Sequence, residues 1–326
     1  MVSKKKRLLT ESFSIEEITF ADYTVLACAI QFNIFDHIER GRNTERFLSK
    51  FVPKNILRPL ISVLVASGYL QKDTKGSITL SPISKKYLTR EAETNLLPFF
   101  SNFEWYLTPI NAPKLLKNGQ NVILRSETFD AITDISHELG KKILPIIETE
   151  AEEIFRDAVD VLDLGCGKMG MMIEAAKRNK KLKVIGIEQN RQTIRYLKER
   201  LQKEDLSKRI NILQADIEDL GNLRRRFDFI ILSHIIHWIK EKSLEKVLKF
   251  CKQHLKENGR LIITEDYLED SGMEPRESVR KNLILSFFGY KVFSIGEIYS
   301  ILRRIGFFKI KSKVVDRRRV LIQAAR

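Results

Sequence analysis

The chain has 326 residues, of which 43% are hydrophobic and 9% aromatic, a composition that excludes a disordered protein and suits two globular domains. No apolar run approaches the roughly 20 residues of a membrane helix, and no signal peptide follows the basic residues 4–7, so we expect a cytoplasmic protein without membrane insertion. The net charge of +15 invites a nucleic-acid function, but basic residues occur along the whole chain beside acidic ones, which argues against nucleic acid as partner.

The three cysteines, Cys28, Cys166 and Cys251, lie far apart in the sequence. No two of them have the spacing of metal ligands, and an odd number is a poor basis for a disulfide framework. We therefore expect reduced thiols and no metal site.

Residues 1–90 show helical periodicity followed by a short β-rich segment. Apolar spacing predicts helices over residues 25–38 and 56–66, and the turn-forming residues 73–76 between two short apolar runs predict a hairpin. Helix, helix, hairpin is the order of a winged helix. We therefore expect residues 1–90 to form a winged-helix-like domain.

Residues 91–157 are expected to form a helical linker with an unusual cluster of aromatic side chains. Part of this cluster must pack in a core, and Trp105 and Tyr106 are candidates for the wall of a substrate pocket. The cluster consists of Phe99, Phe100, Phe103, Trp105 and Tyr106.

From residue 158 to residue 326 the pattern changes to strands alternating with helices. This alternation predicts an α/β fold with a mostly parallel, doubly wound sheet covered by helices on both faces. The chain ends in two β-rich runs whose short connection predicts an antiparallel hairpin. The predicted strands are 159–163, 183–188, 210–215, 227–233, 260–265, 307–315 and 319–325, and the main predicted helices are 170–179, 190–204, 242–257 and 295–305.

A glycine-rich loop follows the first of these strands and opens a helix. Gly165, Gly167 and Gly170 spell G-x-G-x-x-G, in which glycine lets the backbone turn tightly and approach a ligand. Glu188 ends the next strand, where a carboxylate can bind two ribose hydroxyls. The glycine loop and Glu188 alone fit either a nicotinamide dinucleotide or S-adenosylmethionine as the bound cofactor.

Three further features favour S-adenosylmethionine. Asp163 precedes the glycines, where an acid is awkward beside a pyrophosphate but useful beside an ammonium group. Asp216 and Ile217 follow the third strand, where a carboxylate can accept a hydrogen bond from the adenine amino group. The terminal hairpin also differs from the six parallel strands of a dinucleotide fold.

On these motifs, residues 158–326 resemble a class I S-adenosylmethionine-dependent methyltransferase with a seven-stranded sheet whose last strand is antiparallel. The resemblance implies that the glycine loop holds the methionine portion, Glu188 the ribose, and Asp216 with Ile217 the adenine. The family's usual third glycine would fall at Met169, so the end of the loop departs from the pattern. The cofactor-binding residues implied are Asp163, Gly165, Cys166, Gly167, Glu188, Gln189, Asp216, Ile217, Ser233 and His234.

The segment from Ser233 to Trp238 resembles the small-molecule O-methyltransferases of the plant phenolic and hydroxyindole type, which have His-Asp-Trp here. The resemblance implies that His237 is the general base, since imidazole titrates near neutral pH. It also implies that Glu265 orients the histidine and that Phe287 lines the substrate pocket. The family's second orienting glutamate is replaced by Val292, and the aspartate before the tryptophan is missing.

We therefore expect methyl transfer to a hydroxyl of an aromatic or quinol-like molecule, by a homodimer joined through its N-terminal domains. Methylation of carbon or nitrogen on a small metabolite, driven by positioning alone, stays open. An RNA methyltransferase and a non-enzymatic winged-helix regulator are weaker alternatives. The helix expected at 56–66 has only Arg58 as a long polar side chain, which favours an interface over a DNA-reading face.

Overall fold

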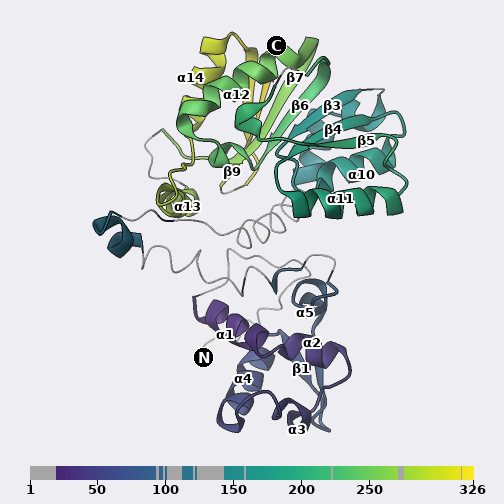
Figure 1. Ribbon diagram of the computed structural model, residues 1–326, viewed down its shortest axis with the longest axis vertical. Coiled ribbons are helices and arrows are strands. Elements are labelled where there is room, and N and C mark those ends of the chain that lie inside the picture. Colours follow the sequence, from purple (N-terminus) through teal and green to yellow (C-terminus); the bar gives the residue numbers. More distant parts are fainter. Residues whose placement is uncertain are drawn as a thin grey trace, which may run out of the picture. The chain divides into compact units, whose positions relative to one another are not determined.

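The computed structural model describes residues 20–92, 95–97, 100, 112–119, 122, 143–157, 159–221, 223–270, 275–316 and 318–326. The chain divides into two compact units (Figure 1). One is built mostly from the first 106 residues and the other mostly from residue 135 onwards.

The N-terminal unit packs short helices around a two-stranded hairpin. Its elements are α1 (Phe20–Gln31), α2 (Ile34–Glu39), α3 (Glu45–Leu48), α4 (Lys54–Ala66), β1 (Leu70–Lys72), β2 (Ile78–Leu80) and α5 (Pro82–Tyr87). The single helix predicted over 25–38 was wrong, because Asn33 adopts a left-handed conformation with φ of 53° and separates α1 from α2. The helix predicted at 56–66 and the hairpin are present.

The C-terminal unit contains a seven-stranded sheet in the order β5-β4-β3-β6-β7-β9-β8. Strands β3 to β7 run parallel, and β9 pairs antiparallel with both β7 and β8. The predicted fold class, with its terminal hairpin, is therefore confirmed. The strands are β3 (Asp160–Leu164), β4 (Lys183–Glu188), β5 (Ile210–Gln214), β6 (Phe227–Ser233), β7 (Leu255–Asp266), β8 (Phe308–Val314) and β9 (Arg319–Ala325).

Helices cover both faces of this sheet because neighbouring strand residues point to opposite sides (Figure 1). Val161 packs with α10 and α11 on one face, whereas Leu162 packs with α12 and α14 on the other. These helices are α10 (Gly170–Arg178), α11 (Arg191–Lys203), α12 (Glu241–His254) and α14 (Ile295–Ile305), and α9 (Glu153–Arg156) precedes β3. Since β3 to β7 run in parallel, their carboxyl ends share one edge, where open sheets of this kind bind ligands.

In the C-terminal unit, two short elements and one helix were not predicted from the sequence. The helix α13 (Arg276–Ser286) lies between β7 and α14, and the short 3-10 helices η2 (Ile217–Asp219) and η3 (Ile236–Trp238) follow β5 and β6. Phe287, expected on a substrate-pocket helix, is the C-cap of α13. No helix in the described part of the chain is both long and apolar enough to cross a membrane.

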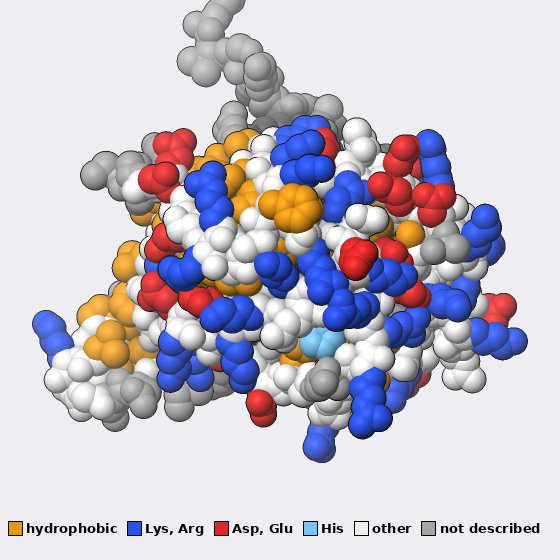
Figure 2. All heavy atoms as spheres, turned by 90° about the horizontal axis from the view of Figure 1, so that it is seen from above, with side chains coloured by type: hydrophobic (Ala, Val, Ile, Leu, Met, Phe, Trp, Pro, Cys, Tyr) orange, Lys and Arg blue, Asp and Glu red, His pale blue; other side chains and the backbone are white. Residues whose placement is uncertain are grey.

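Basic side chains are spread widely over the face seen in Figure 2, with acidic side chains among them. Arg224, Arg225 and Arg226 border a hollow of about 660 Å³ together with Gln253 and His254. Arg225 already pairs with Asp160 at 2.5 Å. The surface therefore mixes both charges, as expected from their distribution along the sequence.

Candidate active site

The glycine loop makes a tight turn between β3 and α10. Gly165 and Gly167 have φ angles of 65° and 50°, in the left-handed region that favours glycine. A Cβ on Gly165 would lie 2.4 Å from the Cγ1 atom of Ile235, so the loop also approaches the segment after β6 closely. Met169 holds the final left-handed position with φ of 51°, and Gly170 begins the helix. The departure from the family's third glycine is thus accommodated by methionine.

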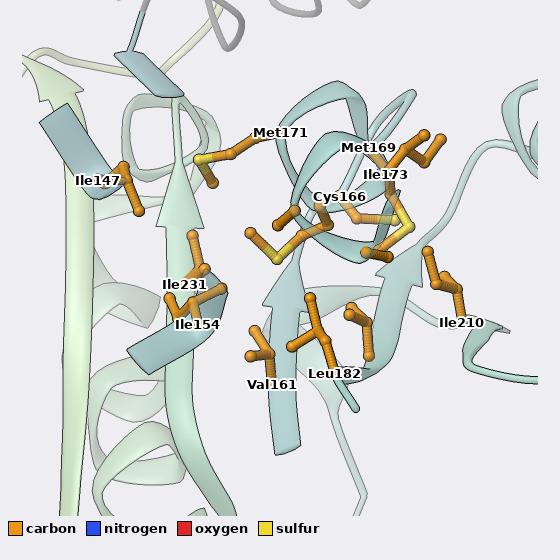
Figure 3. Packing of buried hydrophobic residues seen from close by; sticks show 14 of the residues in the cluster. Ile147, Ile154, Val161, Cys166, Met169, Met171, Ile173, Leu182, Ile210 and Ile231 are labelled. Carbon is orange, nitrogen blue, oxygen red and sulfur yellow. The ribbon is translucent and has the colours of Figure 1, made fainter. Parts of the chain in front are cut away.

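The side chain of Cys166 points away from the loop surface into the core beneath it (Figure 3). It packs with Met169, Met172 and Ile173, and burial raises the pKa of its thiol well above the ordinary value. A Cβ on Gly186 would lie 2.7 Å from the Cys166 sulfur, which shows how closely the thiol is packed. The thiol therefore belongs to the core, and a contact between Cys166 and the cofactor stays a prediction.

Two carboxylates lie beside the loop at the ends of β3 and β4. Asp163 is 5% exposed, and no hydrogen bond to its carboxylate is found among the described residues. Burial raises the pKa of Asp163 to about 7, and the nearby Glu188 carboxylate adds to the rise. A buried carboxylate of this kind gains most from a cationic ligand, since an opposite charge favours its ionised form.

Glu188 is held in place by backbone N–H groups on both sides. Its Oε2 accepts a hydrogen bond from the N–H of Gly167 at 3.0 Å, and its Oε1 accepts from those of Gln189 and Asn190 at 2.8 Å each. The carboxylate therefore lies between the glycine loop and the start of α11. This is the place where the sequence predicted a ribose contact.

The segment after β5 lies at the same edge and is more open. Asp216 is exposed, and its carboxylate accepts a hydrogen bond from the N–H of Glu218 at 2.8 Å, which caps η2. Ile217 is half-buried. Gln214 donates from its Nε2 to the carbonyl of Gln189 at 3.4 Å, which links the ends of β5 and β4.

These positions suit S-adenosylmethionine. Asp163 can hold the methionine ammonium group, and the two oxygens of Glu188 can bind the ribose hydroxyls. The left-handed glycines leave the loop backbone open to a closely placed ligand. In this arrangement the cofactor supplies a methyl group carried on a positively charged sulfur.

His237 and Glu265 form a buried pair on the neighbouring strand ends. The Nδ1 of His237 lies 2.6 Å from Oε1 of Glu265, so this nitrogen donates to the carboxylate and Nε2 remains to accept a proton. The other carboxylate oxygen accepts from the N–H of Ile236 at 2.9 Å. The structure thus brings together the two residues predicted as base and orienter.

Burial lowers the pKa of His237, and the nearby charge of Glu265 opposes this shift. At neutral pH the imidazole is therefore neutral and able to take a proton. Burial also opposes ionisation of Glu265, but the pairing with His237 outweighs it and lowers the carboxyl pKa.

Asp266, Lys281 and Arg318 were not predicted, yet they lie directly behind this pair. The Asp266 carboxylate is 1% exposed and contacts the Lys281 Nζ at 2.5 Å and the Arg318 Nε at 3.2 Å. An acidic pair at the end of a buried strand, Glu265-Asp266, was the available sequence signal. The two cations come from distant segments, so nothing in the sequence pointed to them.

His234 and Ser233 end β6 beside this cluster. His234 has a φ of 52° and a buried Nε2 without a hydrogen-bond partner among the described residues, and burial lowers its pKa to about 4. Ser233 accepts a hydrogen bond from the Thr264 hydroxyl at 2.8 Å. The predicted contacts of Ser233 and His234 with the cofactor stay predictions.

One ligand atom from each of His234, Glu265 and Asp266 lies within 4.8 Å of the others. This grouping does not require a metal ion, because cationic side chains already contact Asp266 and backbone N–H groups already contact Glu265. We assign no metal site to it.

Aromatic side chains lie next to His237. Its ring lies 5.3 Å from that of Trp238, which in turn meets Tyr290 edge-on at 5.4 Å. Phe287 is half-buried at the end of α13. Trp105 and Tyr106, predicted to line the pocket, lie outside the described residues, so their role stays a prediction.

Comparisons with known proteins identify the C-terminal unit. Residues 161–259 match the family model described as "Methyltransferase domain". The S-adenosyl-L-methionine-dependent methyl transferase PigF of Serratia sp. (strain ATCC 39006) is 22% identical, covering 96% of this chain and 95% of that protein. The solved structure titled "PigF with SAH" superposes with a TM-score of 0.76 at 17% identity, covering 94% of this chain and 96% of that one.

Two further solved structures share the fold. Human N-acetylserotonin methyltransferase in complex with SAM has a TM-score of 0.73 at 16% identity, covering 94% of each chain. The O-methyltransferase NcsB1 from neocarzinostatin biosynthesis, in complex with SAM and 2-hydroxy-5-methyl naphthoic acid, has a TM-score of 0.66 at 16% identity, covering 94% and 97%. The resemblance drawn from the sequence is thereby confirmed: residues 161–259 match a methyltransferase domain, and the chain shares the fold of these solved methyltransferases.

Proposed function

We propose that this chain is an S-adenosylmethionine-dependent methyltransferase that methylates a hydroxyl of a small aromatic or quinol-like acceptor. The observation that carries the proposal is the 2.6 Å contact between His237 Nδ1 and Glu265. It leaves a neutral, base-competent imidazole nitrogen beside the cofactor loop, which is what a hydroxyl nucleophile requires.

In the proposed reaction the acceptor hydroxyl loses its proton to Nε2 of His237 as its oxygen bonds to the transferred methyl carbon. When bound, S-adenosylmethionine would supply this methyl group from its positively charged sulfur and would be left as S-adenosylhomocysteine. Glu265 stabilises the imidazolium that forms, because its carboxylate already accepts the Nδ1 hydrogen. Asp163 and Glu188 hold the cofactor so that attack is in line.

The chemistry of related proteins supports a small aromatic acceptor. NcsB1 was crystallised with a hydroxynaphthoic acid, and the name of the human structure is that of an N-acetylserotonin methyltransferase. In this chain Trp238 and Tyr290 lie beside His237 and offer an aromatic surface of the same kind. The N-terminal unit is proposed to join two chains into a homodimer.

A methyl-label transfer assay tests this function. The full chain is incubated with methyl-labelled S-adenosylmethionine and a panel of phenols, hydroxyindoles and quinols, and in parallel with total RNA. Label in the solvent-extractable fraction, on oxygen, is the expected result. Label that precipitates with RNA, or appears only on nitrogen or carbon, would contradict the proposal.

A further inference from the structure

A buried group of opposite charges lies behind the His237–Glu265 pair. Asp266 ends β7 and is 1% exposed, while the side chains of Lys281 and Arg318 are 19% and 17% exposed. Burial opposes ionisation of Asp266, but the two cations outweigh it and lower the carboxyl pKa. These three residues are therefore charged together, away from bulk water, next to the proposed base.

Asp266 is connected to His237 through Glu265. The backbone N–H of Asp266 donates to Oε1 of Glu265 at 2.8 Å, and the same oxygen receives the Nδ1 hydrogen of His237 at 2.6 Å. The side chain of Asp266, held by Lys281 and Arg318, fixes the peptide that makes this bond. The position of the orienting carboxylate thus depends on an ion pair that does not itself touch His237.

The ion pair also fixes α13 against the end of β7. Lys281 projects from this helix to Asp266, and the hydroxyl of Ser278, one turn earlier, donates to the carbonyl of Arg318 at 3.5 Å. At the other end of the segment, the side chain of Asn282 accepts from the N–H of Val292 at 2.8 Å. Three side chains of α13 therefore connect this helix to the segments around the site.

We propose that Asp266 and Lys281 are positioning residues for this reaction, which hold Glu265 in place and together set how strongly Nε2 of His237 retains a proton. Asp266 places a second carboxylate behind Glu265, and Lys281 offsets its charge. The inference rests on the proposed role of His237 as base. It concerns the imidazole itself and not the identity of the acceptor.

Four titratable groups face His237 in the described structure. Glu265 and Asp266 come from β7, His234 from the end of β6, and Lys281 from α13, while Arg318 pairs with Asp266 from the connection between β8 and β9. Burial lowers the pKa of His237 most, Glu265 and Asp266 raise it, and Lys281 lowers it. Removing the two charges singly must therefore move this pKa in opposite directions.

The opposite signs separate electrostatic control from simple loosening of the structure. A variant that only let water into the site would relieve burial and raise the pKa in either case. Asp266→Asn should instead lower it by about 0.5 to 1 unit, and Lys281→Met should raise it by a similar amount. The pKa of His237 in the double variant should lie near that of the wild type. Lys281→Arg should leave this pKa at the wild-type value, because it keeps the positive charge.

The experiment measures the imidazole directly in the full chain. Protein labelled with carbon-13 at the histidine Cε1 is titrated by NMR from acid to alkaline pH, and the His237 signal is identified by its loss in His237→Gln. Lys256→Met is the matched control, because Lys256 pairs with Asp228 at 2.7 Å near the opposite ends of the strands. Its effect on His237 should be negligible.

Shifts of opposite sign that cancel in the double variant would support the inference. Shifts of the same sign, or a Lys281→Met pKa equal to that of the wild type, would overturn it. If Asp266→Asn does not fold, hydrogen exchange of the Ile236 N–H, which donates to Glu265, decides the matter in Lys281→Met. A raised His237 pKa with unchanged exchange supports the inference, whereas faster exchange attributes the rise to water and overturns it. No acceptor is needed, so failure here is distinguishable from failure of the methyl-label assay.

Discussion

Among the described histidines, His237 is distinguished by a hydrogen bond between its Nδ1 and a carboxylate, whereas His234 Nδ1 lies 3.8 Å from the same oxygen of Glu265. His254 is also buried, but its Nδ1 contacts the carbonyl of Phe250 at 2.8 Å. A carboxylate stabilises the imidazolium far better than a carbonyl does, because it carries a full negative charge. The group that contacts Nδ1 therefore distinguishes His237, the candidate base, from His254, a structural histidine.

His237→Gln should lower the rate of methyl transfer by roughly 10²- to 10⁴-fold, since glutamine cannot take the proton. Cofactor affinity, measured by calorimetry, should stay unchanged because His237 is not among the predicted cofactor contacts. His254→Gln serves as the matched control and should keep the wild-type rate. A near-normal rate in His237→Gln would indicate methylation by positioning alone.

The pH dependence of the reaction should reflect the same histidine. Because burial lowers the pKa of His237 below its ordinary value of 6.5, the imidazole stays neutral down to mildly acidic pH. At saturating S-adenosylmethionine, the acid limb of the kcat/KM profile for the acceptor should therefore lie below pH 6.5. An acid limb well above that value would show that another group controls the rate.

Asp163 should couple cofactor binding to pH. Its pKa of about 7 means that the unliganded carboxylate is protonated in acid, whereas the ammonium group of the cofactor favours the ionised form. Affinity for S-adenosylmethionine should therefore fall as the pH drops below about 7. Calorimetry across this range tests the expectation, and Asp163→Asn should bind weakly without this dependence.

The same pKa predicts a gain in stability for that variant. Folding raises the pKa of Asp163, so the folded chain is penalised as the pH rises from the unfolded value of about 4 to about 7. Asp163→Asn removes a penalty on the order of a few kcal/mol. Its thermal unfolding temperature without cofactor should exceed that of the wild type at pH 8 and match it in acid, and equal values at pH 8 would contradict this account.

At the scale of elements, the C-terminal unit follows its sequence pattern closely. The strands Lys183–Glu188 and Phe227–Ser233 and the helix Ile295–Ile305 have the predicted bounds, because buried parallel strands appear as apolar runs and the helix has strong end signals. The helix α13 was missed because it begins with charged residues and has apolar ones mainly at its end. The break at Asn33 was missed because periodicity continues across it.

Part of the candidate site, too, could be predicted from the sequence and part could not. Asp163, Glu188 and Glu265 could be predicted because each lies at or near the end of a recognisable buried strand, and the ends of parallel strands meet at one edge. The roles of Lys281 and Arg318 could not, because only the tertiary fold brings them to Asp266. Local pattern locates strand ends, whereas long-range ion pairs depend on packing.

The glycine loop gives a prediction about an element as a whole. Gly165→Ala combines an unfavourable φ of 65° with a Cβ 2.4 Å from Ile235, so it should lower both thermal stability and cofactor affinity, the backbone strain alone costing about 1–2 kcal/mol. Gly221→Ala is the control, because nothing lies near its Cβ. Combining Gly165→Ala with Ile235→Ala should relieve the clash with Ile235 but not the backbone strain. Full recovery of stability in the double variant would therefore contradict the contribution of backbone strain.

At the scale of the whole molecule, exposed apolar side chains on the N-terminal unit bear on the proposed homodimer. Ile56 and Val63 of α4 are 38% and 42% exposed, and seven residues of separation place them on one face of the helix. Phe51, just before this helix, is 45% exposed. Burying such side chains against a second copy would remove apolar surface from water.

We expect the full chain to be a dimer by light scattering at micromolar concentration, and Val63→Lys to make it monomeric. A two-fold interface doubles every substitution, so one added lysine introduces two buried positive charges that repel each other. Lys75→Glu in the exposed hairpin is the control and should leave the dimer intact. A wild-type chain that is already monomeric would remove the homodimer proposal, and a dimeric Val63→Lys would place the interface on another surface.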